Sequence, residues 1–353
     1  MTLYIPADRL RDFVAGAYRC VGISEEDARA IAELQTEADL RGADGHGVFR
    51  LPQYIRRIKT GGVNVAPDIR IERQTAAMAL VDGDNGMGHL VMRFAAHTAM
   101  AKAKQGGLAW VGVRMSNHAG PASLYATMPL AEGMIGMYFA VGNANHLAPW
   151  GGIELLLSTN PIAVAVPAQE EMPIVLDMAT TTAAYGKVKT AAQRGHAMPP
   201  GWMMDFQGKP LTDPKRADEG MLLPLGGMEA GFKGYGLSLV IGLLAGTLNG
   251  AAMGREVIDF NKDDRSTTNT GHAVVAIDPA AFGDAQQFRT QVDRLIRDIR
   301  ASRRLPGVER IWLPGEQSQQ KRNERMNNGI PVPEPLLASL NKLASELGVA
   351  PLA

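Results

Sequence analysis

Apolar side chains recur at helical spacing near the start of the chain and predict two neighbouring helices. Ser24 and the three acidic residues after it match a capping box, which predicts a helix running to Leu40 and ended by Gly42. A second helix is expected after Gly47, because four apolar residues there share one face: Val48, Leu51, Ile55 and Ile58. The residues between these helices are therefore expected to form a loop.

The middle of the chain alternates short apolar runs, which are typical of strands, with helical segments. The predicted strands are 77–81, 108–113, 135–141, 161–166, 173–176 and 273–277. The predicted helices are one that carries Leu90, Phe94, Met100 and Ala101, an apolar one at 237–248 that is expected to be buried, and two closing ones at 284–302 and 334–347. This order of elements predicts a protein of the α/β class.

Helical ends that flank an α/β middle predict two structural parts. Residues 1–75 and 280–353 are expected to form a discontinuous, mainly helical domain. Residues 76–279 are expected to form a continuous central domain that mixes helices and strands. The chain shows no internal repeat and no long flexible linker that would argue for a different division.

Composition and charge narrow the class of protein. With 353 residues, of which 46% are apolar, the chain can bury a sizeable core. Its 36 basic and 36 acidic residues cancel and form no basic run, which argues against nucleic-acid and membrane-surface partners. The single cysteine, Cys20, is interpreted as a buried apolar residue and excludes an internal disulfide. The first residues lack a secretory apolar segment, so a cytoplasmic protein is expected.

The loop and helix start at 44–54 carry the clearest candidate chemistry. His46 can give or take a proton near neutral pH. Arg50 keeps its charge, and its planar fork fits a carboxylate with two parallel hydrogen bonds. His46, Arg50 and Tyr54 are spaced four residues apart and are expected to face one way. This pattern predicts a site for a small carboxylate substrate, although a solvated helix start would show the same residues.

Several common catalytic motifs are absent from the sequence. No stretch satisfies GxGxxG, the P-loop pattern or the GxSxG nucleophile elbow. The seven histidines never occur as HxxxH or HExxH, so no catalytic metal is expected. Taken alone, the missing GxGxxG would argue against a nicotinamide enzyme with a Rossmann fold.

A series of blocks nevertheless resembles the type-2 malate/L-lactate dehydrogenase family over nearly the whole chain. The blocks are DGHGVFRLPQY (44–54), SNHAG (116–120), APWGGIELLLSTNPIAVAVP (148–167), PIVLDMATTTAAYGKV (173–188), MPPGWMMDFQGKPLTDP (198–214), GFKGYGLSLVIGLLAGTLNG (231–250) and LPGE (313–316). The resemblance implies a non-Rossmann α/β fold whose central domain, 76–279, binds NAD or NADP. It places the helical parts, 1–75 and 280–353, on the substrate side. It also implies a homodimer and reduction of 2-oxo acids or cyclic imino acids.

The resemblance also implies roles for individual residues. His46 and His118 match two histidines to which acid/base catalysis has been assigned, and Arg50 matches the arginine that holds the substrate carboxylate. Tyr54 and Thr159 match residues on the substrate side. The implied cofactor contacts are His118, Leu176, Asp177, Met178, Phe232, Lys233, Leu313, Pro314, Gly315 and Glu316. Asp177 would also suit a cap at a strand end, and Lys233 a surface lysine in a glycine-rich turn.

The sequence departs from the family pattern at three informative positions. Gly45 replaces the serine before the motif histidine, and Lys187 stands where the piperideine-carboxylate reductases have a relay aspartate. Phe232 replaces the common histidine. Without the serine and the aspartate, a relay that tunes His46 cannot be built, so we expect His118 to matter at least as much for proton transfer.

The resemblance therefore implies an NAD(P)-dependent oxidoreductase that interconverts a small 2-oxo acid and its 2-hydroxy acid. Two alternatives remain open. One is a cyclic imino-acid reductase of the piperideine- or pyrroline-2-carboxylate type. The other is a metabolite-binding relative without turnover, which the change at Gly45 would allow.

Overall fold

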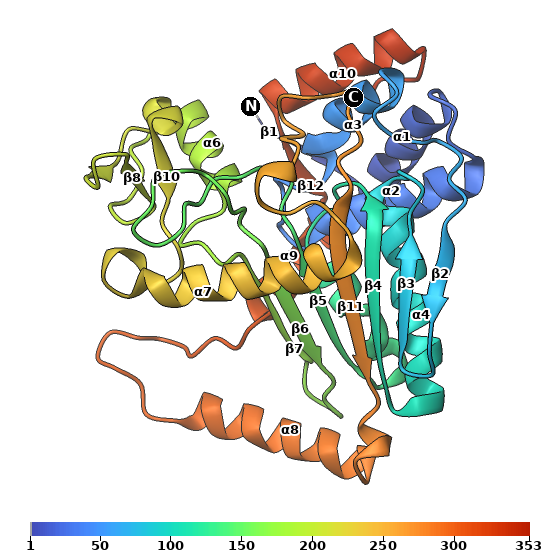
Figure 1. Ribbon diagram of the computed structural model, residues 1–353, viewed down its shortest axis with the longest axis vertical. Helices are drawn as coiled ribbons and strands as arrows, with labels where there is room; N and C mark the ends of the chain where they lie inside the picture. Colours follow the sequence, from blue (N-terminus) through green and yellow to red (C-terminus); the bar gives the residue numbers. More distant parts are fainter. Residues whose placement is uncertain (1) are drawn as a thin grey trace.

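The computed structural model describes residues 2–353 and is built around a seven-stranded sheet in the order β2-β3-β4-β11-β5-β6-β7 (Figure 1). Within the described residues, β3 and β4 run parallel and the other neighbouring pairs antiparallel. The strands are β2 (Arg70–Gln74), β3 (Met78–Asp82), β4 (Leu108–Ser116), β5 (Ile135–Ala140), β6 (Ile162–Val166), β7 (Ile174–Met178) and β11 (Thr270–Ile277). All six predicted strands are thus confirmed, with ends shifted by a few residues.

Helices cover both faces of the sheet. On one face, α4 (Gly88–Gly106) and α5 (Ser123–Ala126) bury a core of small and branched residues against β3, β4 and β5. On the other face, α7 (Gly227–Ala245) packs Ile241 and Ala245 against Phe139 of β5 and Val275 of β11. The sheet therefore sits inside a layered α/β core, as the sequence predicts.

A helical group holds the two ends of the chain together. β1 (Thr2–Ile5) pairs antiparallel with β12 (Ile330–Pro333). Four helices share one apolar core beside this pair: α1 (Ala7–Arg19), α2 (Glu25–Leu40), α3 (Leu51–Lys59) and α10 (Glu334–Leu347). The predicted capping box is present, since the Ser24 side chain accepts a hydrogen bond from the Asp27 N–H. β12 leads into α10, which lies at the same end of the molecule as α1 (Figure 1).

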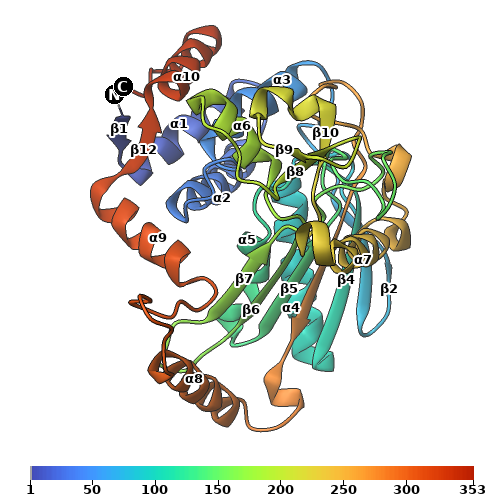
Figure 2. The same cartoon turned by 90° about the vertical axis from the view of Figure 1, so that its left-hand side faces the viewer.

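Two elements belong by sequence to the expected helical parts 1–75 and 280–353 but lie against the central sheet. β2 forms an edge of the central sheet, and α8 (Ala285–Ala301) lies at the far end of that sheet from α1 and α10 (Figure 1). The helix α9 (Glu316–Asn328) runs between α8 and the helical group (Figure 2). The division into two domains remains a prediction.

A small lobe follows β7. It contains α6 (Tyr185–Arg194) and a three-stranded sheet of β8 (Met203–Asp205), β9 (Pro210–Leu211) and β10 (Gly220–Leu222). Val188 of α6 is buried with residues of the three strands, so the lobe has an apolar centre of its own. Short 3-10 helices complete the elements: η1 (Val48–Arg50), η2 (Met128–Glu132), η3 (Pro214–Glu219), η4 (Thr247–Asn249), η5 (Gly254–Glu256) and η6 (Pro279–Ala281).

Two expectations about burial are wrong. The helix predicted as buried at 237–248 is the end of α7, whose outer side exposes Leu237, Val240 and Leu243. An apolar composition on all sides hid this asymmetry. Within residues 2–353, the segment Gly227–Asn249 is also long and apolar enough to cross a membrane, a test that core helices pass as well. The second wrong expectation concerns Cys20, which was expected to be buried. It follows the last residue of α1 and is exposed.

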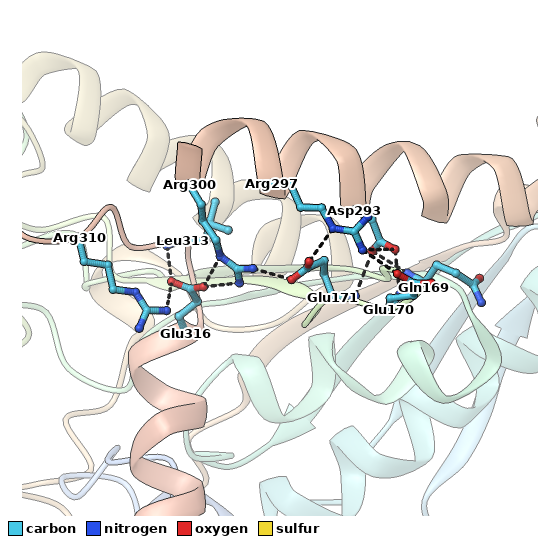
Figure 3. Close-up of polar contacts among 9 residues, drawn as sticks. All are labelled: Gln169, Glu170, Glu171, Asp293, Arg297, Arg300, Arg310, Leu313 and Glu316. Carbon is cyan, nitrogen blue, oxygen red and sulfur yellow. Dashed lines mark hydrogen bonds and ion pairs between the residues drawn. The ribbon is translucent and has the colours of Figure 1, made fainter. Parts of the chain in front are cut away.

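A network of polar contacts fixes α8 and the start of α9 to the turn between β6 and β7 (Figure 3). The buried Asp293 carboxylate accepts the backbone N–H groups of Gln169, Glu170 and Glu171 at 3.0, 2.9 and 3.2 Å. Arg300 then joins Glu171 to Glu316 at 2.5 Å each. This network holds the 313–316 segment beside the sheet.

Candidate functional site

A pocket opens where the loop before α3 meets the ends of β4 and β5. Its lining residues come from segments far apart in the sequence: Gly45, His46, Arg50, His118–Gly120, Tyr138, Ala140–Ala144, His146, Ser158, Thr159, Pro161, Ala184–Gly186, Lys189, Phe260, Asn261 and His272. The predicted residues His46, Arg50, His118 and Thr159 are therefore brought together. No aspartate or glutamate belongs to this lining within the described chain.

The loop that carries His46 is held from below by α2. Asp39 accepts the Val48 N–H at 2.7 Å, and the Gln35 side chain donates to the Gly47 carbonyl at 2.8 Å. A Cβ at Gly47 would overlap the Asp39 carboxylate, so only glycine fits there. Burial raises the pKa of Asp39 to about 8, the main cause being desolvation. The helix expected after Gly47 forms, with its first turn as the 3-10 helix η1.

Arg50 reaches the pocket without a carboxylate partner among residues 2–353. Its Nε donates to the Gly45 carbonyl at 3.0 Å, and its Nη1 donates to the side-chain oxygens of Gln53 and Asn261 at 2.7 and 3.2 Å. The guanidinium also lies 5.1 Å from the Phe260 ring centroid. Because the neutral partners leave the charge uncompensated, Arg50 suits an anionic ligand.

His118 is held far more firmly than His46. Its ring lies between His46 and Phe260, with ring centroids 5.5 and 5.0 Å away. Its Nδ1 is 2.5 Å from the Tyr54 hydroxyl, which leaves Nε2 for the pocket. Tyr54 itself is buried behind His118 and does not line the pocket. No hydrogen bond to the His46 ring exists among the described residues.

Burial keeps the pocket histidines neutral at pH 7. Desolvation, followed by the charge of Arg50, lowers the pKa of His46 to about 4. Burial and the neighbouring His46 and Arg50 place the pKa of His118 well below its ordinary value. Burial likewise lowers the pKa of His146 and of His272 to about 4. The fixed charges of the lining are therefore those of Arg50 and Lys189.

Apart from His118, the predicted cofactor residues lie outside the pocket lining. Asp177 of β7 accepts the Ser123 N–H at 2.9 Å, and Pro314 accepts the Val175 N–H at 3.0 Å, so 176–178 and 313–316 are neighbours. Gly315 has φ 93°, and a Cβ at this position would overlap Val175, so only glycine fits there. The Glu316 carboxylate is already bound by Arg300, Arg310 and the Leu313 N–H.

Phe232 and Lys233 lie on the exposed side of α7. Backbone hydrogen bonds connect this point to the pocket in three steps: Thr180 N–H to Thr159 O at 2.9 Å, Leu225 N–H to Thr180 O at 2.9 Å, and Gly234 N–H to Leu225 O at 3.1 Å. Lys233 makes no ion pair within residues 2–353, and its ammonium lies 5.9 Å from the Phe232 ring centroid. An anionic group of a cofactor would find a free cation here.

Sequence reasoning missed Lys189, Tyr185, Asn261 and the pair Tyr138–His272. The His146 ring stacks on Tyr185 at 3.8 Å, and the Tyr138 hydroxyl is 2.8 Å from His272 Nδ1. The missed residues have no local pattern, because their neighbours come from distant segments.

Comparisons with known proteins agree with this geometry. The family model for malate/L-lactate dehydrogenase matches residues 5–341. This chain belongs to the malate/L-lactate dehydrogenase family. It is accordingly an oxidoreductase that acts on CH–OH groups with a nicotinamide cofactor, and its fold is that of the family.

Individual relatives of this family member share nearly its whole length. A malate dehydrogenase from Pyrococcus horikoshii is 39% identical over 98% of this chain and 96% of its own. A solved malate dehydrogenase structure from that organism has a TM-score of 0.91 at 37% identity, covering 99% and 97% of the two chains. An L-sulfolactate dehydrogenase from Methanocaldococcus jannaschii is 38% identical over 93% and 92%. A delta1-piperideine-2-carboxylate reductase structure from Pseudomonas syringae has a TM-score of 0.85 at 30% identity, covering 97% and 100%.

The residues present fit a nicotinamide cofactor. Gly120, Ala140, Gly142 and Pro161 bring little side-chain bulk to the lining of the pocket, which leaves room for a flat ring. The free ammonium of Lys233 suits the negatively charged diphosphate of a dinucleotide. No GxGxxG loop is needed for this arrangement, which explains how the family function coexists with the missing Rossmann motif.

Proposed function

We propose that this protein interconverts a small 2-oxo acid and its 2-hydroxy acid. The observation that carries the proposal is the placement of His118, oriented by Tyr54, beside an Arg50 that has no carboxylate partner among residues 2–353. One group can move a proton and the other can hold a carboxylate. These are the two tasks that remain once a nicotinamide cofactor supplies or accepts the hydride.

In this proposal, Arg50 binds the carboxylate next to the reacting carbon and so fixes which face of that carbon is presented. His118 exchanges a proton with the adjacent oxygen through Nε2, a contribution of about 10²–10⁴-fold. The Tyr54 hydroxyl holds Nδ1, so the ring keeps its direction in both protonation states. His46 contributes a hydrogen bond to the substrate beside Arg50, and Thr159 borders the same space.

The bound carboxylate also prepares His118 for its proton. The positive charge of Arg50 is one reason why the pKa of His118 is low, after burial and His46. A substrate anion on Arg50 offsets that charge and raises the pKa of His118 toward neutrality. The free site thus holds a neutral His118. Binding of either acid brings the pKa of His118 nearer to neutrality, so that the ring can donate a proton in reduction and accept one in oxidation.

The proposed cofactor contacts are His118, 176–178, Phe232, Lys233 and 313–316, for either NAD or NADP. This set is supported by the backbone hydrogen bonds that link Thr180, which follows β7, to Thr159 of the pocket, and Val175 to Pro314. Glu316 acts indirectly, because its carboxylate is bound to Arg300 and to the Leu313 N–H. We also propose a cytoplasmic homodimer. The exposed apolar side of α7 supports the dimer, since such patches commonly mark contacts between subunits.

A cyclic imino-acid reductase is the second candidate, favoured by the structural similarity to the Pseudomonas syringae reductase. Two observations weaken it. Gly45 offers His46 no hydroxyl, and Lys187 is exposed on α6. A relative without turnover is the third candidate, and the intact pair of His118 and Tyr54 argues against it.

The test is oxidation of NADH and NADPH, followed by absorbance, over a panel of 2-oxo acids and cyclic imines. We expect turnover with at least one 2-oxo acid and slower turnover with imines. Faster reduction of the imines would establish the second candidate. Nucleotide binding without turnover on any compound would establish the third.

A further inference from the structure

Arg50 has little hydrogen-bonding capacity left for a carboxylate. A guanidinium carries five N–H hydrogens, one on Nε and two on each of Nη1 and Nη2. The Nε of Arg50 donates to the Gly45 carbonyl at 3.0 Å. Its Nη1 donates to the side-chain oxygens of Gln53 and Asn261 at 2.7 and 3.2 Å, which accounts for both hydrogens of that nitrogen. Within residues 2–353, Nη2 is therefore the nitrogen of this group without a hydrogen-bond partner.

A carboxylate that makes two parallel hydrogen bonds needs two neighbouring nitrogens of the guanidinium. Nη2 can act together with Nε or with Nη1, and both of these are engaged. One protein oxygen must therefore leave Arg50 when such a carboxylate binds. Gln53 is held at its other end, where it donates to the Phe260 carbonyl at 2.7 Å. The Asn261 oxygen makes the longest of the three contacts, so it is the one most readily released.

The Asn261 oxygen already has a second cationic partner. The Lys189 ammonium, on α6, lies 3.2 Å from it. The backbone N–H and the side-chain NH₂ of Asn261 both donate to Asp259 Oδ1, at 2.9 and 3.0 Å, so this residue is anchored independently of Arg50. When Arg50 turns to another acceptor, the Asn261 oxygen keeps a charged donor and is not left unpaired.

We propose that Asn261 competes with the substrate for Arg50: its amide oxygen holds Nη1 until a carboxylate displaces it, and the displaced oxygen stays with Lys189. The exchange is favourable because an ionised carboxylate is a stronger acceptor for a guanidinium than a neutral amide. Asn261 thus sets how tightly the pocket binds carboxylates, with a sign opposite to that of a residue that holds the substrate. This inference rests on the proposed function, in which Arg50 binds the carboxylate.

Binding of oxamate tests the competition without relying on turnover. Oxamate has the size of the smallest 2-oxo acids and a carbonyl next to its carboxylate, and it is titrated calorimetrically into protein saturated with NADH or NADPH. We expect Asn261→Ala to bind oxamate about 2–12-fold more tightly than wild type, because one net hydrogen bond no longer has to be broken. Asn261→Ser, with its shorter side chain, should shift the affinity in the same direction. Asn327→Ala removes an exposed asparagine of α9 and should leave the affinity unchanged.

Lys189→Met tests where the displaced oxygen goes. In the wild-type background this change removes the partner of the displaced oxygen, so oxamate binding should weaken. In the Asn261→Ala background there is no oxygen to receive, so the weakening should be at least about twofold smaller. An equal weakening in both backgrounds would show that Lys189 contacts the ligand itself and would contradict the transfer.

The competition and the proposed function fail in different ways. If both Asn261 variants bind oxamate as wild type does or more weakly, while Arg50→Gln loses at least about tenfold in affinity, the competition is wrong and the carboxylate clamp stands. Unchanged oxamate affinity in Arg50→Gln, or no oxamate binding by wild type, would remove the clamp and the competition with it. Melting temperatures establish that each variant is folded.

Discussion

His118 and His46 face the same pocket but are held in opposite ways. His118 directly follows a strand, is stacked on both ring faces and has Nδ1 bound by the Tyr54 hydroxyl. His46 sits on a loop whose backbone is fixed by Asp39 and Gln35, while its ring has no hydrogen-bond partner among residues 2–353. We call the side of the pocket that carries His118, after β4, the strand-end wall, and the side formed by residues 45–50 the loop wall. In the strand-end wall a side chain is fixed by its contacts, whereas in the loop wall the backbone is fixed and presents Arg50.

This difference suggests a division of labour. A proton donor needs a ring with a set direction, which the strand-end wall supplies. A carboxylate clamp needs a fixed cation, which the loop wall supplies through Arg50. The following changes test each wall in turn.

The largest effect is expected from Arg50→Lys, which changes the loop wall while keeping its charge. A lysine cannot make the two parallel hydrogen bonds of a guanidinium. We expect kcat/KM to fall about 100-fold, the size of one lost hydrogen bond between charged groups. Steady-state kinetics over the accepted acids measure this. Near-wild-type efficiency on every acid would remove Arg50 as the carboxylate clamp.

Tyr54→Phe removes the hydroxyl that orients His118 on the strand-end wall. We expect kcat to fall about tenfold, since one hydrogen bond to a charged ring is lost, and the pH profile to shift. Tyr18→Phe is the matched control, because this buried hydroxyl binds Gln35 beneath the loop wall at 3.0 Å. An identical pH profile in both variants would show that Tyr54 does not act through His118.

Lys233→Ala tests whether the cofactor site, which adjoins the strand-end wall, includes Lys233. Removal of an exposed ammonium should weaken nucleotide binding about fivefold and leave the fold intact. Calorimetric titration of NADH and NADPH measures the change, with Lys209→Ala as a control for an exposed lysine in the small lobe. Unchanged affinity for both nucleotides would take Lys233 out of the site.

The smallest effect concerns Asp39 below the loop wall. Its folded pKa of about 8 lies above the ordinary value near 3.8, so the folded state favours the protonated form. The contribution of Asp39 to the free energy of unfolding is therefore fully present below the ordinary pKa and is lost as the pH rises through about 8. Asp39→Asn should remove that loss, so its melting temperature should change by a few degrees less than that of wild type between pH 6 and 9. Parallel melting curves would contradict this.

Much of the fold was predictable because its signals are local. The Ser24 cap and the six apolar strands depend on neighbouring residues alone. β2 was missed because most of its residues are exposed at an edge and carry no apolar alternation. The exposed side of α7 was missed because both sides are apolar, so the pattern could not tell which side faces the sheet.

The candidate site divides in the same way. His46 and Arg50 could be found because they lie four residues apart in one short segment. The pairing of Tyr54 with His118 spans 64 positions, and that of Lys189 with Asn261 spans 72. No periodicity links such residues, so their meeting depends on how the helices and loops pack.

The pH dependence of kcat for 2-oxo acid reduction by His118→Asn and His46→Asn tests the central claim most directly. The limb near neutral pH reports the group that donates the proton in the substrate complex. If the strand-end wall holds the donor, His118→Asn loses this limb and His46→Asn keeps it. Loss of the limb in His46→Asn alone, with His118→Asn unchanged, would contradict the account and assign the donor to the loop wall.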